Sequence, residues 1–417
     1  MKVLHRLTVA LLMLGLFTIS LRTSAADWPQ WRGPNRDGKV LDVVLPATWP
    51  KTLSEEWKVT VGIGHSSPVL AGGRIYVFTR QGEDEVLQCL DAVTGKEIWR
   101  SAQPISYTMH EAATGHGKGP KSTPVVHNGS VYTFGISGVL SAHDARTGKL
   151  KWRQDFASQY PKTSPLFGTA MSPLIEGGLL IAHVGGHDQG ALTAFDPATG
   201  AVKWSNPLDG PAYSSPIAVT LAGVRQLVTS TQKNVIGVEA ATGKLLWKLP
   251  AKSQYDENSV TAVAFKDMVV VSREGQGLTA IRLEKQGVDL VPREVWTNKE
   301  NMMYLNSPVV EGNRLFGLSS QKKGQFFAID LDTGNTLWQG PGRMGENAAM
   351  LNLGGKMLLL LTNEANLIVL PADAKDYTPL VQYSVANSPT WAHPLVTGKR
   401  IFIKDETTLR SLAITGN

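Results

Sequence analysis

The chain has 417 residues, of which 42% are hydrophobic and 18% are charged, and this composition excludes an intrinsically disordered protein. Its 41 glycines and 11 tryptophans favour an all-β protein with many turns and large apolar anchors. The formal net charge is +6 and falls to about +3 without the three basic residues that precede Asp27, which is too weak a bias to indicate nucleic acid or anionic lipid as a partner.

Residues 1–26 have the features of a secretory signal peptide. Lys2 and Arg6 form a basic start, the apolar run LTVALLMLGLFTISL follows, and the small residues TSAA precede Asp27. The apolar run is shorter than the roughly 20 residues of a membrane-spanning helix, and no second span follows. We therefore expect a soluble, periplasmic or secreted protein without a transmembrane span after cleavage. The single cysteine, Cys89, is expected in a buried strand.

Residues 27–54 are predicted to form an N-terminal arm. Its opening stretch, WPQWRGPNRDG, is rich in Pro, Gly and Asn, which predicts a loop. We expect the indoles of Trp28 and Trp31 to plug one face of the fold that follows, or to fasten the arm to it.

Five nearly identical phrases, each nine residues long, occur in the rest of the chain. They are DAVTGKEIW, DARTGKLKW, DPATGAVKW, EAATGKLLW and DLDTGNTLW, which begin at Asp91, Asp144, Asp196, Glu239 and Asp330. The acidic residue is placed to accept backbone N–H bonds in a turn, and the glycine supplies the positive φ of a tight hairpin with a bulge. Each phrase therefore predicts a strand end, a turn and a returning strand that carries a tryptophan.

A second phrase, of the type SSPVLAGGRIYVF from Ser66, recurs between these copies and predicts another hairpin. One full unit is thus a sheet of four antiparallel strands, repeated every 40 to 50 residues or so, which is the period of a propeller blade. We expect an aromatic anchor on each outer strand, packed between neighbouring blades: Trp57, Trp99, Trp152, Trp204, Trp247, Trp296, Trp338 and, in a degenerate unit, Tyr383.

These anchors predict eight blades. The last segment of the chain supplies only three strands, and SEEWKVTV near the N-terminus is a strand without a blade. We therefore predict that residues 55–61 pair with the C-terminal sheet and close an eight-bladed propeller over residues 55–417, which leaves no open sheet edge.

The DxxTGKxxW units, the SSP strand starts and the opening DWPQWRGPNRDG resemble the PQQ-binding-like β-propeller superfamily over essentially residues 27–417. This superfamily contains quinoprotein alcohol dehydrogenases and the outer-membrane assembly factor BamB. The repeat is specific for the fold and shared by enzymes and scaffolds alike. Two departures from BamB are the missing lipid-attachment cysteine and the long arm with the loop HEAATGHGKGP.

The loops that lead into the innermost strands of a propeller surround its axis, so ligand-binding residues are expected there. In this chain they combine histidines, carboxylates, amides and aromatic rings, and the longest of them, residues 106–121, is the expected lid or partner contact. The predicted axial funnel contains His65, His110, Glu111, His116, Tyr213, Asp256, Glu257, Asn258, Tyr304, Asn306, Glu346, Asn347, Trp391 and His393.

The resemblance leaves three functions open. The favoured one is a non-catalytic envelope scaffold that binds a protein or peptide, similar to BamB; the second is binding of a carbohydrate or other small polar ligand in the funnel. The third is a PQQ-dependent dehydrogenase, for which Asp256, Glu257 and Asn258 would offer calcium ligands and Trp391 a stacking surface. The dehydrogenases of this superfamily carry adjacent cysteines over the quinone, whereas this chain has Cys89 alone, so no cofactor or catalytic residue is assigned.

Overall fold

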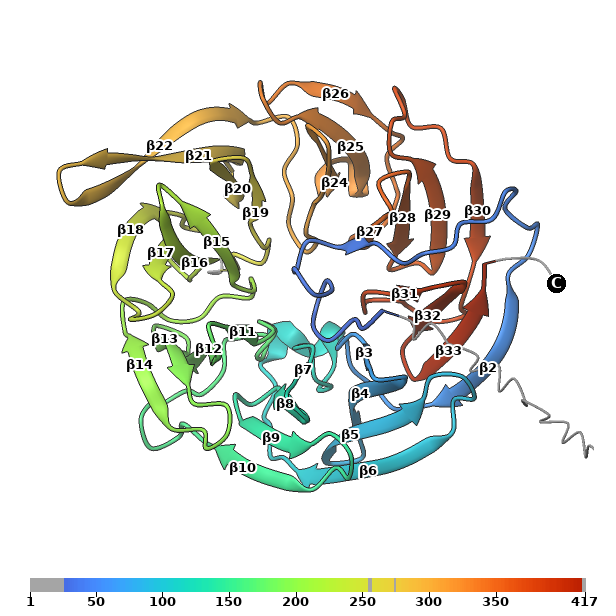
Figure 1. Ribbon diagram of the computed structural model, residues 1–417, viewed down its shortest axis with the longest axis horizontal. Helices are drawn as coiled ribbons and strands as arrows, with labels where there is room; N and C mark the ends of the chain where they lie inside the picture. The colour runs from blue at the N-terminus through green and yellow to red at the C-terminus, as the bar shows by residue number, and fades with distance from the viewer. Residues whose placement is uncertain (1–25, 254–256, 274, 415–417) are drawn as a thin grey trace, which may run out of the picture.

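The computed structural model describes residues 26–253, 257–273 and 275–414, whose sheets form a ring of eight blades around a central axis (Figure 1). The prediction of an all-β, eight-bladed propeller is confirmed. The predicted signal peptide lies, apart from residue 26, outside the described residues. None of the helices in these ranges is long and apolar enough to cross a membrane.

Blades 1 to 4 follow the chain in order, each with its first strand next to the axis and its fourth at the rim. Blade 1 contains β3 (Val69–Ala71), β4 (Arg74–Gln81), β5 (Asp84–Asp91) and β6 (Glu97–Pro104). Blade 2 contains β7 (Val125–His127), β8 (Ser130–Phe134), β9 (Leu140–Asp144) and β10 (Leu150–Gln154). Blade 3 contains β11 (Leu174–Glu176), β12 (Leu179–Gly186), β13 (Gln189–Phe195) and β14 (Val202–Asn206). Blade 4 contains β15 (Ile217–Leu221), β16 (Val224–Ser230), β17 (Asn234–Glu239) and β18 (Leu245–Pro250).

Blades 5 to 8 complete the ring. Blade 5 contains β19 (Val263–Phe265), β20 (Met268–Arg273), β21 (Gly277–Gln286) and β22 (Asp289–Asn298). Blade 6 contains β23 (Val309–Glu311), β24 (Arg314–Ser319), β25 (Gln325–Asp330) and β26 (Thr336–Gln339). Blade 7 contains β27 (Ala348–Leu353), β28 (Met357–Thr362), β29 (Asn366–Pro371) and β30 (Val381–Ser384). Blade 8 contains β31 (Leu395–Thr397), β32 (Arg400–Lys404), β33 (Thr408–Ala413) and the N-terminal β2 (Ser54–Thr60), and two short 3-10 helices, η1 (Glu111–His116) and η2 (Gln321–Lys323), lie in loops.

The ring closes through a strand from the other end of the chain. β2 pairs antiparallel with β33, so that Lys58 lies opposite Arg410, and Arg400 forms a 2.7 Å ion pair with Glu56. Buried side chains from blades 7, 8 and 1 belong to one continuous core across this junction. The predicted closure by an N-terminal strand is confirmed.

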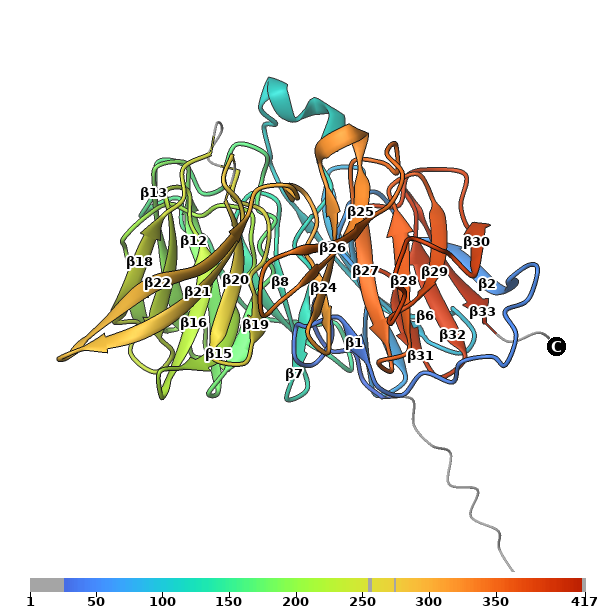
Figure 2. The ribbon, with the colours of Figure 1, turned by 90° about the horizontal axis from the view of Figure 1, so that it is seen from above.

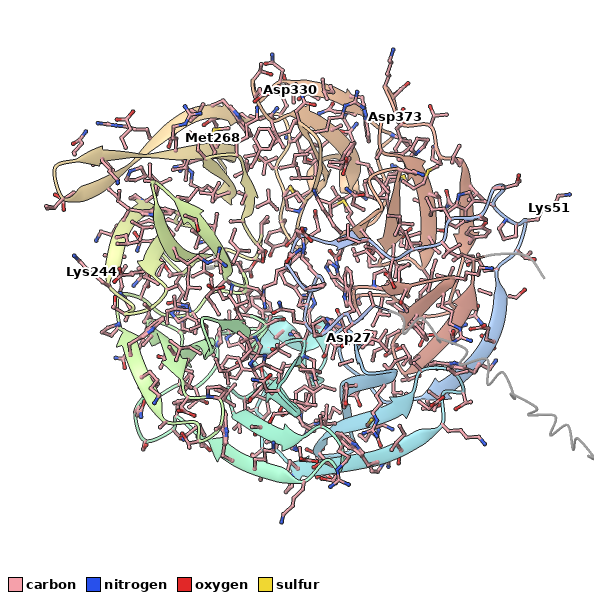
Figure 3. The ribbon with its side chains drawn as sticks, viewed as in Figure 1. Asp27, Lys51, Lys244, Met268, Asp330 and Asp373 are labelled. Carbon is pink, nitrogen blue, oxygen red and sulfur yellow. The ribbon has the colours of Figure 1, made fainter. Side chains whose placement is uncertain are left out.

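The repeated phrases explain how neighbouring blades hold each other at the rim. The tryptophan of one blade lies against the glycine in the turn of the next, where a Cβ on Gly243 would meet the ring of Trp204 at 2.3 Å. The same contact joins Trp57 to Gly95, Trp99 to Gly148, Trp152 to Gly200 and Trp296 to Gly334. These turns lie at the outer edge of the ring, as Lys244 and Asp330 show (Figure 3). Glycine is required there twice over, because its φ is positive and the indole occupies the space of a side chain.

Blade 5 departs from this pattern, as its degenerate sequence suggests. Its third and fourth strands continue past the rim as a ten-residue-per-strand hairpin that projects from the ring (Figure 1). Blade 5 has no Thr-Gly turn against which Trp247 of blade 4 could pack. The Trp247 indole N–H instead donates to Oε1 of Gln226 in its own blade (2.6 Å).

The N-terminal arm crosses one face of the ring, opposite the face where η1 rises (Figure 2). Its strand β1 (Lys39–Val40) pairs parallel with β27, and Trp28 is buried in a backbone bridge to Leu70. The WPQWRGPNRDG stretch is a chain of turns, as predicted, and it fastens the arm to the inner ends of the blades.

Candidate functional site

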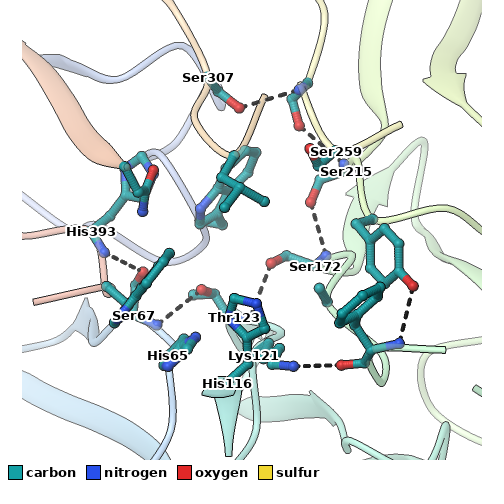
Figure 4. A pocket seen from close by; sticks show the side chains of 18 of the residues that line it. His65, Ser67, His116, Lys121, Thr123, Ser172, Ser215, Ser259, Ser307 and His393 are labelled. Atoms are coloured by element: carbon teal, nitrogen blue, oxygen red, sulfur yellow. Dashed lines mark hydrogen bonds between the residues drawn. The ribbon is translucent and has the colours of Figure 1, made fainter. Parts of the chain in front are cut away.

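A pocket lies on the axis of the ring and is lined by the loops that precede the inner strands (Figure 4). Its volume is about 1000 Å³, including the mouth that is open to solvent. The walls come from all eight blades, and Trp31 of the N-terminal arm contributes to the lining. A closed ring therefore brings together side chains from residue 31 to residue 393.

A belt of hydroxyl groups holds the inner strands together at the wall of this pocket. Each belt member accepts, on its side-chain oxygen, the backbone N–H of the corresponding residue in a neighbouring blade. The six bonds, donor first, are His393 to Ser67 (2.9 Å), Ser67 to Thr123 (3.1 Å), Thr123 to Ser172 (3.0 Å), Ser172 to Ser215 (2.9 Å), Ser215 to Thr261 (3.0 Å) and Thr261 to Ser307 (3.2 Å). Because these serines and threonines satisfy buried N–H groups, the belt fixes the positions of the loops above it.

Three aromatic rings form one wall. Trp391 and His65 are stacked, with centroids 5.1 Å apart and planes 11° apart, and His116 lies edge-on to both. Burial, reinforced by the positive charge of Lys121, lowers the pKa of His65 to about 3 and that of His116 below its ordinary value. His65 is therefore neutral at physiological pH and serves as a flat, polar surface.

The loop of residues 106–121 reaches this wall through a close backbone contact. A Cβ on Gly119 would lie 2.5 Å from the Cα of Gly64, so neither loop tolerates a side chain at the crossing. The carbonyl of Pro120 accepts the N–H of His65 (2.8 Å). This contact holds Lys121, whose ammonium donates to the carbonyl of Phe167 (2.5 Å), beside the stacked pair.

The floor is made by the arm. The ring of Trp31 lies 5.4 Å from His393 in a T-shaped contact, and the guanidinium groups of Arg32 and Arg36 each lie 5.5 Å from the Trp31 ring. Burial, with a contribution from the charge of Arg32, lowers the pKa of His393 to about 3. The arm therefore places two cations beneath an aromatic floor.

Eight of the fourteen predicted funnel residues line this pocket: His65, His116, Tyr213, Glu257, Tyr304, Asn347, Trp391 and His393. Whether they bind a ligand stays a prediction. Asp256 lies outside the described residues.

The other five predicted residues lie elsewhere. His110 and Glu111 are exposed at the start of η1, where Nδ1 of His110 accepts the N–H of Ala112, and Glu346 is exposed. Asn258 and Asn306 are buried, and their amides bond backbone groups, as shown by the bond from Nδ2 of Asn306 to the carbonyl of Leu318 (3.0 Å). These two asparagines fasten loops and do not face the pocket.

Sequence reasoning missed the belt and much of the lining. The missed residues are Ser67, Lys121, Thr123, Phe167, Ala170, Ser172, Ser215, Ser259, Thr261, Leu305 and Ser307; Trp31 was expected at one face of the ring but was not assigned to the funnel. A signal for the belt existed, because a serine or threonine directly precedes the proline in each of the four copies of the second phrase. No local signal distinguishes Lys121 or Phe167 from other loop residues.

The ring, its tryptophan contacts and its axial pocket define a β-propeller of the PQQ-like superfamily, as the sequence resemblance implied. A comparison with known families agrees with this superfamily and identifies one family within it. The family described as outer membrane protein assembly factor BamB matches residues 47–217 and 83–340, so the chain belongs to this family.

Individual relatives include outer membrane protein assembly factors and alcohol dehydrogenases. BamB of Yersinia pestis is 24% identical over 385 residues, 87% of this chain and 90% of that protein. The dehydrogenase subunit of a quinone alcohol dehydrogenase from Komagataeibacter europaeus is 25% identical over 310 residues, 64% of this chain and only 39% of the enzyme. The solved structure of quinohemoprotein alcohol dehydrogenase ADHIIG from Pseudomonas putida HK5 shares the fold, with a TM-score of 0.69 and 13% identity over 94% of this chain and 80% of that one.

The residues of this pocket do not fit a calcium-bound quinone. Calcium needs six to eight oxygen ligands. Of the predicted ligands that the structure describes, Asn258 does not line the pocket and is held in place by Nδ2, which donates to three backbone carbonyls, and the Glu257 carboxylate accepts the hydroxyl of Tyr304. Within the described ranges, no three acidic, histidine or cysteine side chains are grouped so as to hold a metal ion. One face of Trp391, the predicted stacking surface, is already covered by His65.

Proposed function

We propose that this protein is an exported, non-catalytic scaffold of the cell envelope that binds a segment of another protein on its open face. The observation that carries the proposal is the match to the BamB family over most of the ring. The predicted leader at residues 1–26 supports export, and the family's printed description supports a place in the envelope. Binding of a carbohydrate or other small polar ligand in the pocket stays a second prediction.

The two faces of the ring differ in a way that supports binding on one of them. The arm crosses one face of the ring, whereas η1 rises from the opposite face (Figure 2). Trp31 of the arm lines the axial pocket from the first side, and His116 at the end of η1 lines it from the other. Exposed loops on a rigid ring are suited to recognition, because the ring holds them without moving. A partner is therefore expected on the face of η1.

Site-specific photo-cross-linking in the native envelope tests this proposal. A benzophenone amino acid replaces Thr114, which is exposed on η1, or Val44, which is exposed on the arm and serves as the matched control. We expect a discrete adduct with an envelope protein from Thr114 and none from Val44. Equal adducts from both positions, or none from either, would contradict the proposal.

A further inference from the structure

One lysine of the axial pocket carries an unbalanced charge. Lys121 lines the pocket and its ammonium donates to the carbonyl of Phe167, which leaves two of its three hydrogens available for other acceptors. In the part of the chain that the structure describes, no carboxylate forms an ion pair with it. Burial lowers the pKa of Lys121 to about 8, so the group is still largely protonated at neutral pH.

Two further cations lie beneath the floor. Arg32 and Arg36 are 1% and 3% exposed, and neither forms an ion pair with a described carboxylate. Arg36 donates to the backbone carbonyls of Pro173 (2.8 Å) and Ser172 (2.9 Å), and Arg32 donates to that of Pro308. Their Nε atoms have no hydrogen-bond partner among the described residues. Buried guanidinium groups without a bonded carboxylate are costly, and their field is weakly screened.

Three carboxylates lie near the pocket without lining it: Glu346, whose charge acts on His116, and Asp405 and Glu406, which line a neighbouring pocket beyond His65 and Trp391. Glu257 is the one carboxylate in the described lining, and it accepts the hydroxyl of Tyr304. Burial lowers the pKa of Arg32 to about 10, and the charge of Asp37, whose carboxylate accepts the N–H of Lys39 (3.0 Å), partly opposes that effect. Within the described lining, Lys121 therefore has no carboxylate partner, and the apolar rings of Phe167 and Trp391 lie at the same end of the pocket.

We propose that the axial pocket binds a carboxylate that lies next to an apolar group, and that Lys121 contacts this carboxylate. Both groups belong to a peptide segment of the partner protein, which enters the pocket through its mouth. Lys121 supplies the charge-assisted hydrogen bonds, the arginine pair beneath Trp31 supplies a fixed positive background, and the aromatic walls cover the apolar neighbour. This inference rests on the proposed scaffold function for the peptide source. The carboxylate chemistry is shared with a free organic acid, and the experiment separates the two.

The first arm of the test uses the intact protein with phenylacetate and its neutral analogue phenylacetamide, measured by ligand-observed NMR titration. We expect phenylacetate to bind about tenfold more tightly, and Lys121→Gln to remove most of that preference. Lys118→Gln, at an exposed lysine of the same loop, is the matched control and should leave the preference unchanged. Equal affinity for the acid and the amide would overturn the inference, as would a preference that survives in Lys121→Gln with an unchanged melting curve.

The second arm compares acetylated, amidated tetrapeptides of sequence Gly-Phe-Asp-Gly and Gly-Phe-Asn-Gly. Tighter binding of the aspartate peptide, lost in Lys121→Gln, supports a peptide ligand. Selectivity for phenylacetate without selectivity between the peptides would overturn the peptide source.

Photo-cross-linking from Thr114 separates this inference from the scaffold proposal. An adduct that forms equally well with Lys121→Gln would overturn the inference and leave the scaffold intact. Carboxylate selectivity without any adduct would instead contradict the scaffold function, while the Lys121 site itself would stand.

Discussion

The outer rim and the axial pocket of this ring are built from the same repeats but use them differently. At the rim, one contact recurs at five blade junctions, where a tryptophan covers the turn glycine of the next blade. At the axis, the belt of hydroxyl groups recurs, but the side chains above it differ in every blade and include histidines, a lysine, a carboxylate and aromatic rings. The difference indicates that the repeated contacts stabilise the ring, and that the pocket residues that differ from blade to blade are available for recognition.

The largest test of this comparison removes one rim contact. Trp204 is 9% exposed and lies against Gly243, so Trp204→Ala is expected to lower the free energy of unfolding by about 3 to 5 kcal/mol in denaturant melts. Val288→Ala, at a side chain that is 99% exposed, should change it by less than about 0.5 kcal/mol. A loss below about 1 kcal/mol for Trp204→Ala would show that the rim does not carry the stability.

A second test asks why a glycine is needed at position 243: only for its positive φ, or also because the Trp204 indole leaves no space for a side chain. Gly243 and Gly223 have similar φ values of +72° and +79°, but a Cβ would meet Trp204 at Gly243 and nothing within 4 Å at Gly223. Gly223→Ala should cost about 1 to 2 kcal/mol from the backbone alone. Gly243→Ala should cost about 1 to 3 kcal/mol more, because the indole must move. Equal losses of stability for the two variants in thermal or urea melts would show that the indole does not require a glycine at position 243.

A third test moves to the belt at the axis. Ser215→Ala leaves the buried N–H of Ser172 without an acceptor and should lower stability by about 1 to 3 kcal/mol. Ser122 provides the matched control, because its buried hydroxyl has no partner among the described residues and Ser122→Ala should be nearly neutral. If the two variants melt alike, the belt bonds do not stabilise the ring.

The smallest expected effect is on the stability of the protein at acidic pH. The pKa of His393 is about 3 in the folded protein and 6.5 in the unfolded chain, so unfolding takes up a proton between these values and stability falls as the pH drops below 6.5. Glu85, whose pKa burial raises to about 7, acts in the opposite direction. The comparison of wild type with His393→Gln isolates one group, and the variant should lose about 1.5 kcal/mol less between pH 6.5 and 5 in urea melts. Parallel pH profiles would argue against a buried neutral His393.

The sequence predicted the ring better than the pocket. The blade number, the closing strand and the rim tryptophans follow from a repeated local pattern, and each repeat reports on the same contact. Lys121 and Phe167 meet only because the loops that lead into two neighbouring blades lie side by side, which no local pattern encodes. A loop was predicted for the stretch that contains Arg32 and Arg36, but arginine is rarely buried without a partner, so its sequence does not indicate that both side chains are buried. Asn258 and Asn306 carry the residue types of ligands, but tertiary contacts turn their amides toward the backbone.

The pairing of β2 with β33 has a consequence for how the protein is made. One strand of the last blade emerges from the ribosome near the start of synthesis, and its partner emerges at the very end. The earlier blades can assemble while the chain is still growing, but the circle cannot shut until translation and any export are complete. A nascent chain therefore keeps an unpaired strand at each end of its array, and during that interval it depends on chaperones, or on speed, to avoid pairing with another molecule.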